Sequence, residues 1–203
     1  MAPHIHAQPQ LTSRSSHCRY NGSLRAIKLP DGHPLKVQAQ KITEGNPYTT
    51  TLHTINSAII KLGKLTPACK VYRGISGGVL PEQFRKPNKQ NVCGGVEFSF
   101  MSTTTNREVA AHYAAGGGKA GLLFEIQMGI IDRGAEISWL SQYPHEKEVL
   151  LPPLTGIEAL NVDVEGNLLV IHSRLSLNLA AHTLEQVLSR RRKMLVSKRA
   201  TNL

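Results

Sequence analysis

The segment Trp139-Leu-Ser-Gln-Tyr143-Pro-His-Glu146-Lys-Glu148-Val-Leu-Leu151 is the most informative part of the sequence for both fold and chemistry. It places two carboxylates two residues apart, at the start of an apolar stretch that we predict to be a buried strand. In an extended chain such residues point to the same face, roughly 6–7 Å apart. Two carboxylates that close together are costly unless a cation or a reaction uses them. The alternative is a solvated acidic strand end, with the intervening lysine between the two acids.

Short apolar stretches on both sides of this segment predict a sheet. Helical spacing of apolar residues begins near Tyr48, recurs before the glycine run 116–118 and recurs again near the C-terminus. We therefore predict helices beside the sheet. We therefore expect an α+β fold with a mixed, mainly antiparallel β-sheet core and flanking helices. No Gly-x-Gly-x-x-Gly follows a strand, which argues against Rossmann-type dinucleotide binding. The expected strands are Lys70–Arg73, Glu97–Met101, Gly121–Met128, Val149–Leu151 and Leu168–Leu175, and the later helices are 106–115 and 180–194.

Two local details accompany these elements. Asn106 is the expected N-cap of the internal helix, with Glu108 in its first turn. Residues 129–145 are expected to be mostly loop, and the single tryptophan there, Trp139, is expected to anchor packing rather than to bind a ligand.

The charge distribution divides the chain into three regions. The net charge is +10. Residues 1–41 hold six Lys or Arg and one acid, residues 185–203 hold six and one acid, and the interval between is neutral. We expect a loosely ordered segment over 1–40, whose removal spares catalysis, a catalytic domain over 41–195 and a basic tail over 196–203. The basic ends could bind nucleic acid or acidic membrane weakly. The reading that we prefer is a solvated end, so nucleic acid is not an expected partner.

Composition bounds the class of protein further. With 203 residues and 40% hydrophobic content, the chain can form one domain with a core. No apolar run reaches the length of a membrane span, and the N-terminus lacks the pattern of a secretory signal. The three cysteines, Cys18, Cys69 and Cys93, do not have metal-site spacing, so we expect free thiols and no metal, with a bridge between the last two as the alternative. We expect a cytoplasmic monomer.

Two other segments supply polar residues of different chemistry. Val71-Tyr72-Arg73-Gly74 ends one expected strand with a cation before a glycine, and Phe98–Asn106 ends another in the hydroxyls Ser-Thr-Thr. The order arginine, serine, Glu-x-Glu resembles the arginine, serine, glutamate class of mono-ADP-ribosyltransferases. The Glu-x-Glu form, with an aromatic three residues before the first glutamate, resembles the arginine-specific branch. The resemblance runs from about Tyr48 to about Arg192.

The resemblance implies a set of residues for NAD, which is consumed as a co-substrate, with NADP as a further candidate. Glu148 would stabilise the oxocarbenium-like ribose and bond its 2′-hydroxyl. Ser102 would hold Glu148 and the ribose in place. Arg73 would face the diphosphate, and Gly74 would let the backbone approach the nicotinamide amide. The family usually has Ser-Thr-Ser, so Thr104 is a departure at the third position that leaves Ser102 intact.

The same resemblance implies an acceptor site for a protein arginine. A guanidinium is a poor nucleophile until a carboxylate orients it and takes a proton, which is the role of Glu146. Tyr143 could stack on the guanidinium plane. The sequence therefore predicts transfer of ADP-ribose from NAD to arginine. The alternatives are an NAD glycohydrolase, which needs neither Tyr143 nor Glu146, and an inactive binding module of the same fold.

Overall fold

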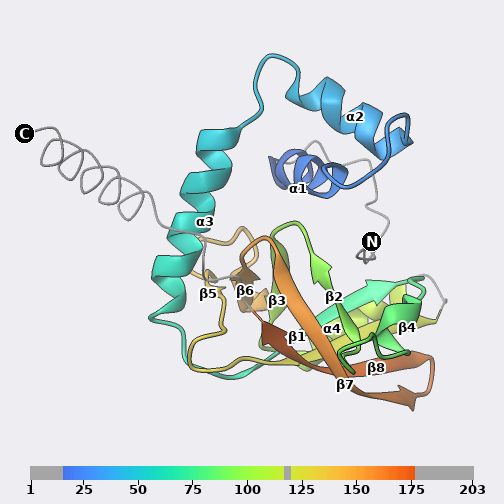
Figure 1. Ribbon diagram of the computed structural model, residues 1–203. Coiled ribbons are helices and arrows are strands. Elements are labelled where there is room, and N and C mark those ends of the chain that lie inside the picture. The colour runs from blue at the N-terminus through green and yellow to red at the C-terminus, as the bar shows by residue number, and fades with distance from the viewer. Residues whose placement is uncertain (1–15, 117–119, 177–203) are drawn as a thin grey trace, which may run out of the picture.

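The computed structural model describes residues 16–116 and 120–176, which form an eight-stranded sheet with helices around it (Figure 1). Six of the seven strand pairings are antiparallel, and only β4 with β8 is parallel. The α+β expectation with a mainly antiparallel sheet is confirmed. The helices are α1 (Ser16–Ala26), α2 (Pro34–Thr43), α3 (Thr49–Gly63) and α4 (Arg107–Ala115), with the short helical turns η1 (Glu82–Phe84) and η3 (Pro144–Glu146). The strands are β1 (Lys70–Ser76), β2 (Gly94–Glu97), β3 (Met101–Thr104), β4 (Gly121–Gln127), β5 (Ala135–Glu136), β6 (Glu148–Leu151), β7 (Thr155–Glu165) and β8 (Leu168–Ser176).

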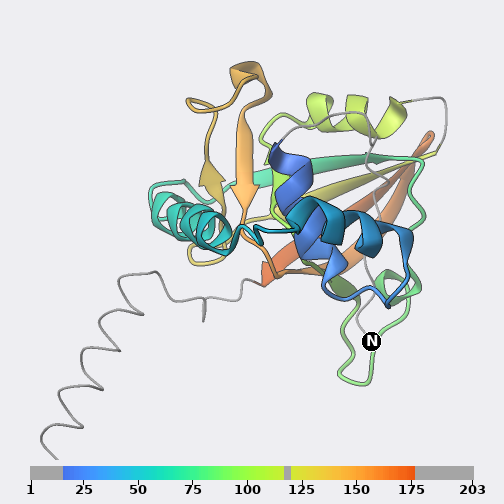
Figure 2. The same ribbon diagram turned by 90° about the horizontal axis from the view of Figure 1, so that it is seen from above.

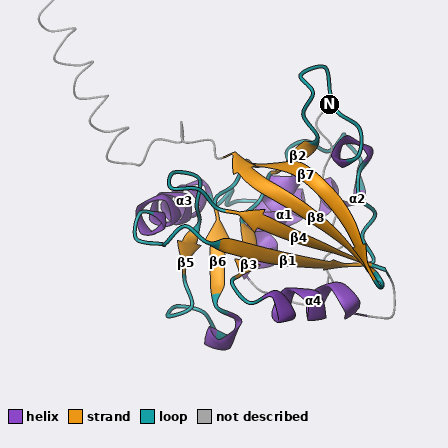
Figure 3. Ribbon diagram, turned by 90° about the horizontal axis from the view of Figure 1, so that it is seen from below, coloured by secondary structure: helices purple, strands orange, loops and turns teal. Residues whose placement is uncertain are grey.

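The sheet is curled, because a short link joins two strands that lie far apart in the strand order. The order is β2-β7-β8-β4-β1-β3-β6-β5, so β2 lies at one edge and β3 lies five places away. Only Phe98, Ser99 and Phe100 join these two strands. The three linking residues make four Cα–Cα steps, which span at most about 14 Å, so the end of β2 must fold back beside the start of β3. Figures 2 and 3 show β1, β4, β8 and β7 converging at one end and spreading apart at the other.

The two neighbours of β1 differ in how they pair with it. β1 pairs with β4 along its whole length, from Lys70 to Ser76, but with β3 only at Tyr72 opposite Thr104. Beyond that pair β1 and β3 diverge. The sheet thus has two parts that meet near Arg73, one made of β5, β6 and β3 and the other of the remaining strands.

Helices cover different parts of the sheet. α4 packs along β1 and β4, on the face opposite the main core (Figure 3). α3 packs beside β5 through Ile59 and its neighbours. The main core contains Val71, Phe124 and Ile171 from three adjacent strands. None of the helices in the described part of the chain has the length and apolar content that crossing a bilayer requires.

Several sequence expectations need correction. The expectation of loose order over 1–40 is wrong for residues 16–40, which contain α1 and most of α2. The expected strand Glu97–Met101 is broken at Phe98–Phe100 between β2 and β3. β7, the longest strand, was not expected, because its alternating polar residues follow a pair of prolines that indicate an end to regular structure. The expected helix over 180–194 lies outside the described residues.

The N-terminal helix α1 is attached to the sheet by buried polar contacts. The side chain of Asn21 donates to the carbonyl of Phe100 and accepts from the amide of Phe100, each at 3.1 Å. These two bonds satisfy the amide and the carbonyl of Phe100, which lies between the two strands. Tyr20 and Leu24, one turn apart, pack on the cluster that contains Phe100. Removing this helix would therefore uncover the link between β2 and β3.

Candidate active site

Glu148 begins β6 and lies beside the hydroxyls of β3. Glu148 is opposite Thr104 in the antiparallel register, so Ser102 occupies the diagonal position on the same face. The Ser102 hydroxyl donates to Glu148 Oε1 at 2.6 Å, and the Ser141 hydroxyl lies 3.4 Å from Oε2. Both oxygens of this half-buried carboxylate thus face hydroxyl groups that fix its orientation.

Arg73 lies next to this pair, where β1 and β3 separate. Its Nη1 donates to the carbonyl of Ser102 at 2.9 Å. Burial lowers the pKa of Arg73, the Glu97 carboxylate opposes that effect, and the charge of Arg25 adds to it. An arginine stays charged under all these influences, because a guanidinium does not lose its proton in a protein. The structure thus brings together the arginine, serine and glutamate of three separate sequence motifs.

Glu146 has a different geometry from the one that the sequence suggested. It ends the helical turn η3, and Lys147 after it has the left-handed conformation, with φ 46°. Only Glu148 therefore lies on the strand, and the expected arrangement of two carboxylates on one extended strand is wrong. Two other contacts hold Glu146. The Thr104 hydroxyl donates to its carbonyl, and the Tyr113 hydroxyl donates to its Oε1 at 2.7 Å.

The aromatic residues before Glu146 are exposed. Tyr143 is 51% exposed, and its ring meets that of His145 edge-on with 6.1 Å between centroids. Trp139 is 67% exposed, so the expectation that it anchors packing is wrong. Ile137, two residues earlier, packs instead against the apolar cluster that contains Ile59. The loop thus exposes two aromatic side chains in the segment that leads to Glu146.

Comparison with known proteins identifies this arrangement. A family model described as NAD:arginine ADP-ribosyltransferase matches residues 36–174, more than half of the chain. The chain belongs to this family. No curated protein sequence matches the chain.

Solved structures of ADP-ribosyltransferases share the fold of this family member. ADP-ribosyltransferase HopU1 of Pseudomonas syringae pv. Tomato DC3000 is 24% identical with a TM-score of 0.56, and the match covers 77% of this chain. This chain spans 64% of the length of HopU1. The Vis toxin of Vibrio splendidus is 22% identical with a TM-score of 0.54, over 80% of this chain and 70% of Vis. A structure of Vis in complex with agmatine is 22% identical with a TM-score of 0.55, over 81% of this chain and 71% of that one.

This family member also has a buried carboxylate that the sequence did not reveal. Glu97 at the end of β2 is 4% exposed and receives two bonds from Arg25 of α1, each at 3.2 Å. The amide and hydroxyl of Ser99 also donate to it, at 2.9 and 2.7 Å. Burial acts to raise the pKa of Glu97, but Arg25, and then Arg73 and Ser99, bring it below its ordinary value. Nothing local in the sequence indicates this pair, because 72 residues separate its members.

Gly74 has a structural reason to be glycine. A Cβ at this position would lie 1.8 Å from the carbonyl oxygen of Ala110 and 2.7 Å from the amide of Ala114, both in the backbone of α4. The helix therefore packs directly on the backbone of β1. A side chain at this position would point toward α4. The contact with α4 therefore requires glycine here, independently of any role of the Gly74 backbone in binding.

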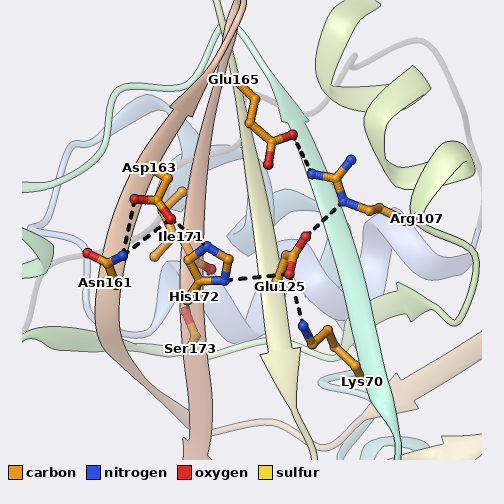
Figure 4. A network of polar contacts seen from close by, with 9 residues as sticks. All are labelled: Lys70, Arg107, Glu125, Asn161, Asp163, Glu165, Ile171, His172 and Ser173. Carbon is orange, nitrogen blue, oxygen red and sulfur yellow. Dashed lines mark hydrogen bonds and ion pairs between the residues drawn. The ribbon is translucent and has the colours of Figure 1, made fainter.

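A polar network anchors the start of α4 on the sheet (Figure 4). At its centre is the nearly buried Glu125 of β4, which bonds Arg107 Nε at 2.8 Å and Lys70 Nζ at 3.2 Å. Burial raises the pKa of Glu125, but the bonds from Arg107 and Lys70 lower it below its ordinary value overall. Arg107 also bonds Glu165 at 2.6 Å, and His172 lies between Glu125 and Asp163. These contacts fix α4, and with it Tyr113, relative to β1 and β4.

Other features of the described residues bear on metals and disulfides. In the ranges that the structure describes, no group of three or more His, Cys, Asp or Glu is suited to hold a metal ion. Cys69 and Cys93 are free thiols, so the alternative of a bridge between them is not realised.

A cavity of about 700 Å³ lies between η1, β2 and β7, and none of the site residues predicted from the sequence lines it.

Proposed function

We propose that this protein transfers ADP-ribose from NAD to an arginine side chain of a target protein and releases nicotinamide. The observation that carries the proposal is the 2.6 Å bond from Ser102 to Glu148, with Arg73 beside it and Glu146 in the adjoining turn. The family of the chain has NAD and arginine in its description. The proposed site therefore has a donor half and an acceptor half.

In the donor half, Arg73 takes the diphosphate of NAD, where its planar fork suits phosphate oxygens. Gly74 offers its backbone to the nicotinamide amide. The bond between ribose C1′ and the nicotinamide nitrogen breaks, and its electron pair leaves with neutral nicotinamide, so the leaving group needs no acid. Glu148, held by Ser102, bonds the ribose 2′-hydroxyl and stabilises the positive charge that develops on the ribose.

In the acceptor half, Glu146 binds the guanidinium and Tyr143 stacks on its plane. A guanidinium nitrogen forms the new bond to C1′, and its proton passes to Glu146. An NAD glycohydrolase would use water instead and would need only the donor half. The separate contacts that hold Glu146 support transfer, because NAD hydrolysis does not require this side chain.

The test uses labelled NAD and agmatine, a free guanidine. Agmatine suits this purpose because the Vis toxin, which has this fold, is known in complex with it. We expect nicotinamide and ADP-ribosylagmatine as products of the wild type. Glu146→Gln should retain nicotinamide release but lose most of the agmatine product. Nicotinamide release by the wild type without any ADP-ribosylagmatine would refute transfer and support hydrolysis.

Three finer proposals concern the co-substrate and the setting. NADP has the same reacting half as NAD, so the residues proposed here suit both, and rates of nicotinamide release from each will compare them. We propose a monomer, since Arg73, Ser102, Glu146 and Glu148 all come from one chain. A cytoplasmic location fits the free thiols of Cys69 and Cys93. Sedimentation and cell fractionation test these two points.

A further inference from the structure

Tyr113 has an unusual position for a surface aromatic residue. It lies in the last part of α4 and is 55% exposed, yet its hydroxyl donates to Glu146 Oε1 at 2.7 Å. The two residues are 33 positions apart in the chain and belong to elements that make no sheet pairing with each other. The Glu-x-Glu motif includes Glu146, whereas Tyr113 belongs to none of the motifs that carry the family resemblance.

The position of Glu146 depends on few contacts. The turn η3 and the left-handed Lys147 keep it out of the ladder of β6. Its backbone is held by the Thr104 hydroxyl. Among the described residues, Tyr113 makes the one hydrogen bond that the structure gives to its carboxylate. A side chain with three rotatable bonds samples many rotamers unless such a contact restricts it.

The charges around Tyr113 show which part of the site it faces. Its bond to Glu146, then burial, then the nearby Tyr143 and Glu148 raise the pKa of Tyr113 to about 12. The hydroxyl therefore stays protonated and remains a donor at neutral pH. A carboxylate can accept about four hydrogen bonds, so this one leaves room for a two-pronged guanidinium. Tyr113 can hold Glu146 without displacing the acceptor.

We propose that Tyr113 is a positioning residue of the acceptor site, whose hydroxyl holds Glu146 in the orientation that binds the guanidinium. This inference rests on the proposed function. Tyr113 is itself fixed, since α4 packs against the backbone of Gly74 and is anchored by Arg107 on Glu125 (Figure 4). Helix α4 thus fixes Tyr113 relative to β1, the strand that carries Arg73 of the donor half.

The experiment removes one oxygen atom. Tyr113→Phe keeps the ring, so the melting temperature should stay within about 2 °C of wild type. A hydrogen bond to a charged group corresponds to about a tenfold effect, so kcat/KM for agmatine should fall about tenfold. The KM for NAD and the rate of NAD hydrolysis should not change. Tyr48→Phe, which deletes the hydroxyl of a tyrosine at the start of α3, is the matched control and should match wild type.

The double variant with Glu146→Gln separates positioning from a general effect. If Tyr113 acts through Glu146, adding Tyr113→Phe to Glu146→Gln should change transfer by less than about twofold. Equal loss of transfer and hydrolysis in Tyr113→Phe, or unchanged transfer, would overturn the inference while the wild-type product still supports the proposed function. A wild type that forms no ADP-ribosylagmatine would refute both.

Discussion

Replacing Arg25 by alanine tests whether α1 is part of the folded catalytic unit. The change removes two hydrogen bonds and a positive charge from Glu97, which is 4% exposed. What remains around Glu97 is the amide and hydroxyl of Ser99 and the charge of Arg73. The carboxylate therefore stays buried but loses its closest cation.

The expected cost follows from burial. Removing one partner of a buried ion pair commonly costs about 3–5 kcal/mol. Arg25 is 20% exposed and Ser99 still donates two bonds, so about 2–3 kcal/mol is the reasonable expectation here. For a protein of this size, about 1 kcal/mol lowers the melting temperature by about 2–4 °C. Arg25→Ala should therefore melt about 5–10 °C below wild type at neutral pH.

The effect should depend on pH in a defined direction. A carboxyl with a lowered folded pKa stabilises the protein above its ordinary pKa, and that contribution disappears as pH falls through the folded value. Burial acts on Glu97 to raise its pKa, and the charge of Arg25 is the largest opposing influence. Without Arg25 the pKa of Glu97 rises, so the variant takes up a proton at higher pH and sheds its buried charge. The difference in melting temperature should be largest at pH 8 and smaller near the ordinary glutamate pKa of 4.5.

Arg174→Ala serves as the matched control. Arg174 also makes two bonds to a glutamate, at 2.7 and 2.9 Å to Glu158, but it is 60% exposed. If burial rather than bond length decides the cost, this variant should melt close to wild type. Melting followed by circular dichroism at pH 8 and pH 4.5 measures all three proteins. An Arg25→Ala protein as stable as wild type at pH 8, or with the same deficit at both pH values, would refute the reasoning.

Three further variants test the site itself. Glu148→Gln keeps the shape but loses the charge opposite the ribose, so nicotinamide release should fall about 10²–10³-fold, and a loss under threefold would exclude Glu148 as the catalytic carboxylate. Arg73→Lys keeps the charge but not the fork, so the KM for NAD should rise, while unchanged KM and turnover would contradict the diphosphate contact. Gly74→Ala places a methyl group against the backbone of α4, so the melting temperature should drop, and a wild-type value would show that α4 can shift.

The sequence by itself determined the features that are local in the chain. The Asn106 cap of α4 is confirmed, because a capping side chain bonds an amide two residues away, here that of Glu108 at 2.9 Å. The apolar runs of β4 and β8 predicted strands correctly, because a run of apolar residues is a local pattern that a few neighbouring residues define. Arg73, Ser102 and Glu148 were found because each belongs to a short motif of distinct chemistry.

Tertiary structure decided the features that join distant parts of the chain. The curl of the sheet breaks the expected strand at Phe98–Phe100 and leaves a link that Asn21 of α1 must satisfy. The Arg25–Glu97 and Tyr113–Glu146 bonds join residues 72 and 33 positions apart. No period or local propensity encodes such a pairing, because its energy exists only when the sheet has brought the two side chains together. The orientation of the acceptor carboxylate is therefore a property of the folded molecule.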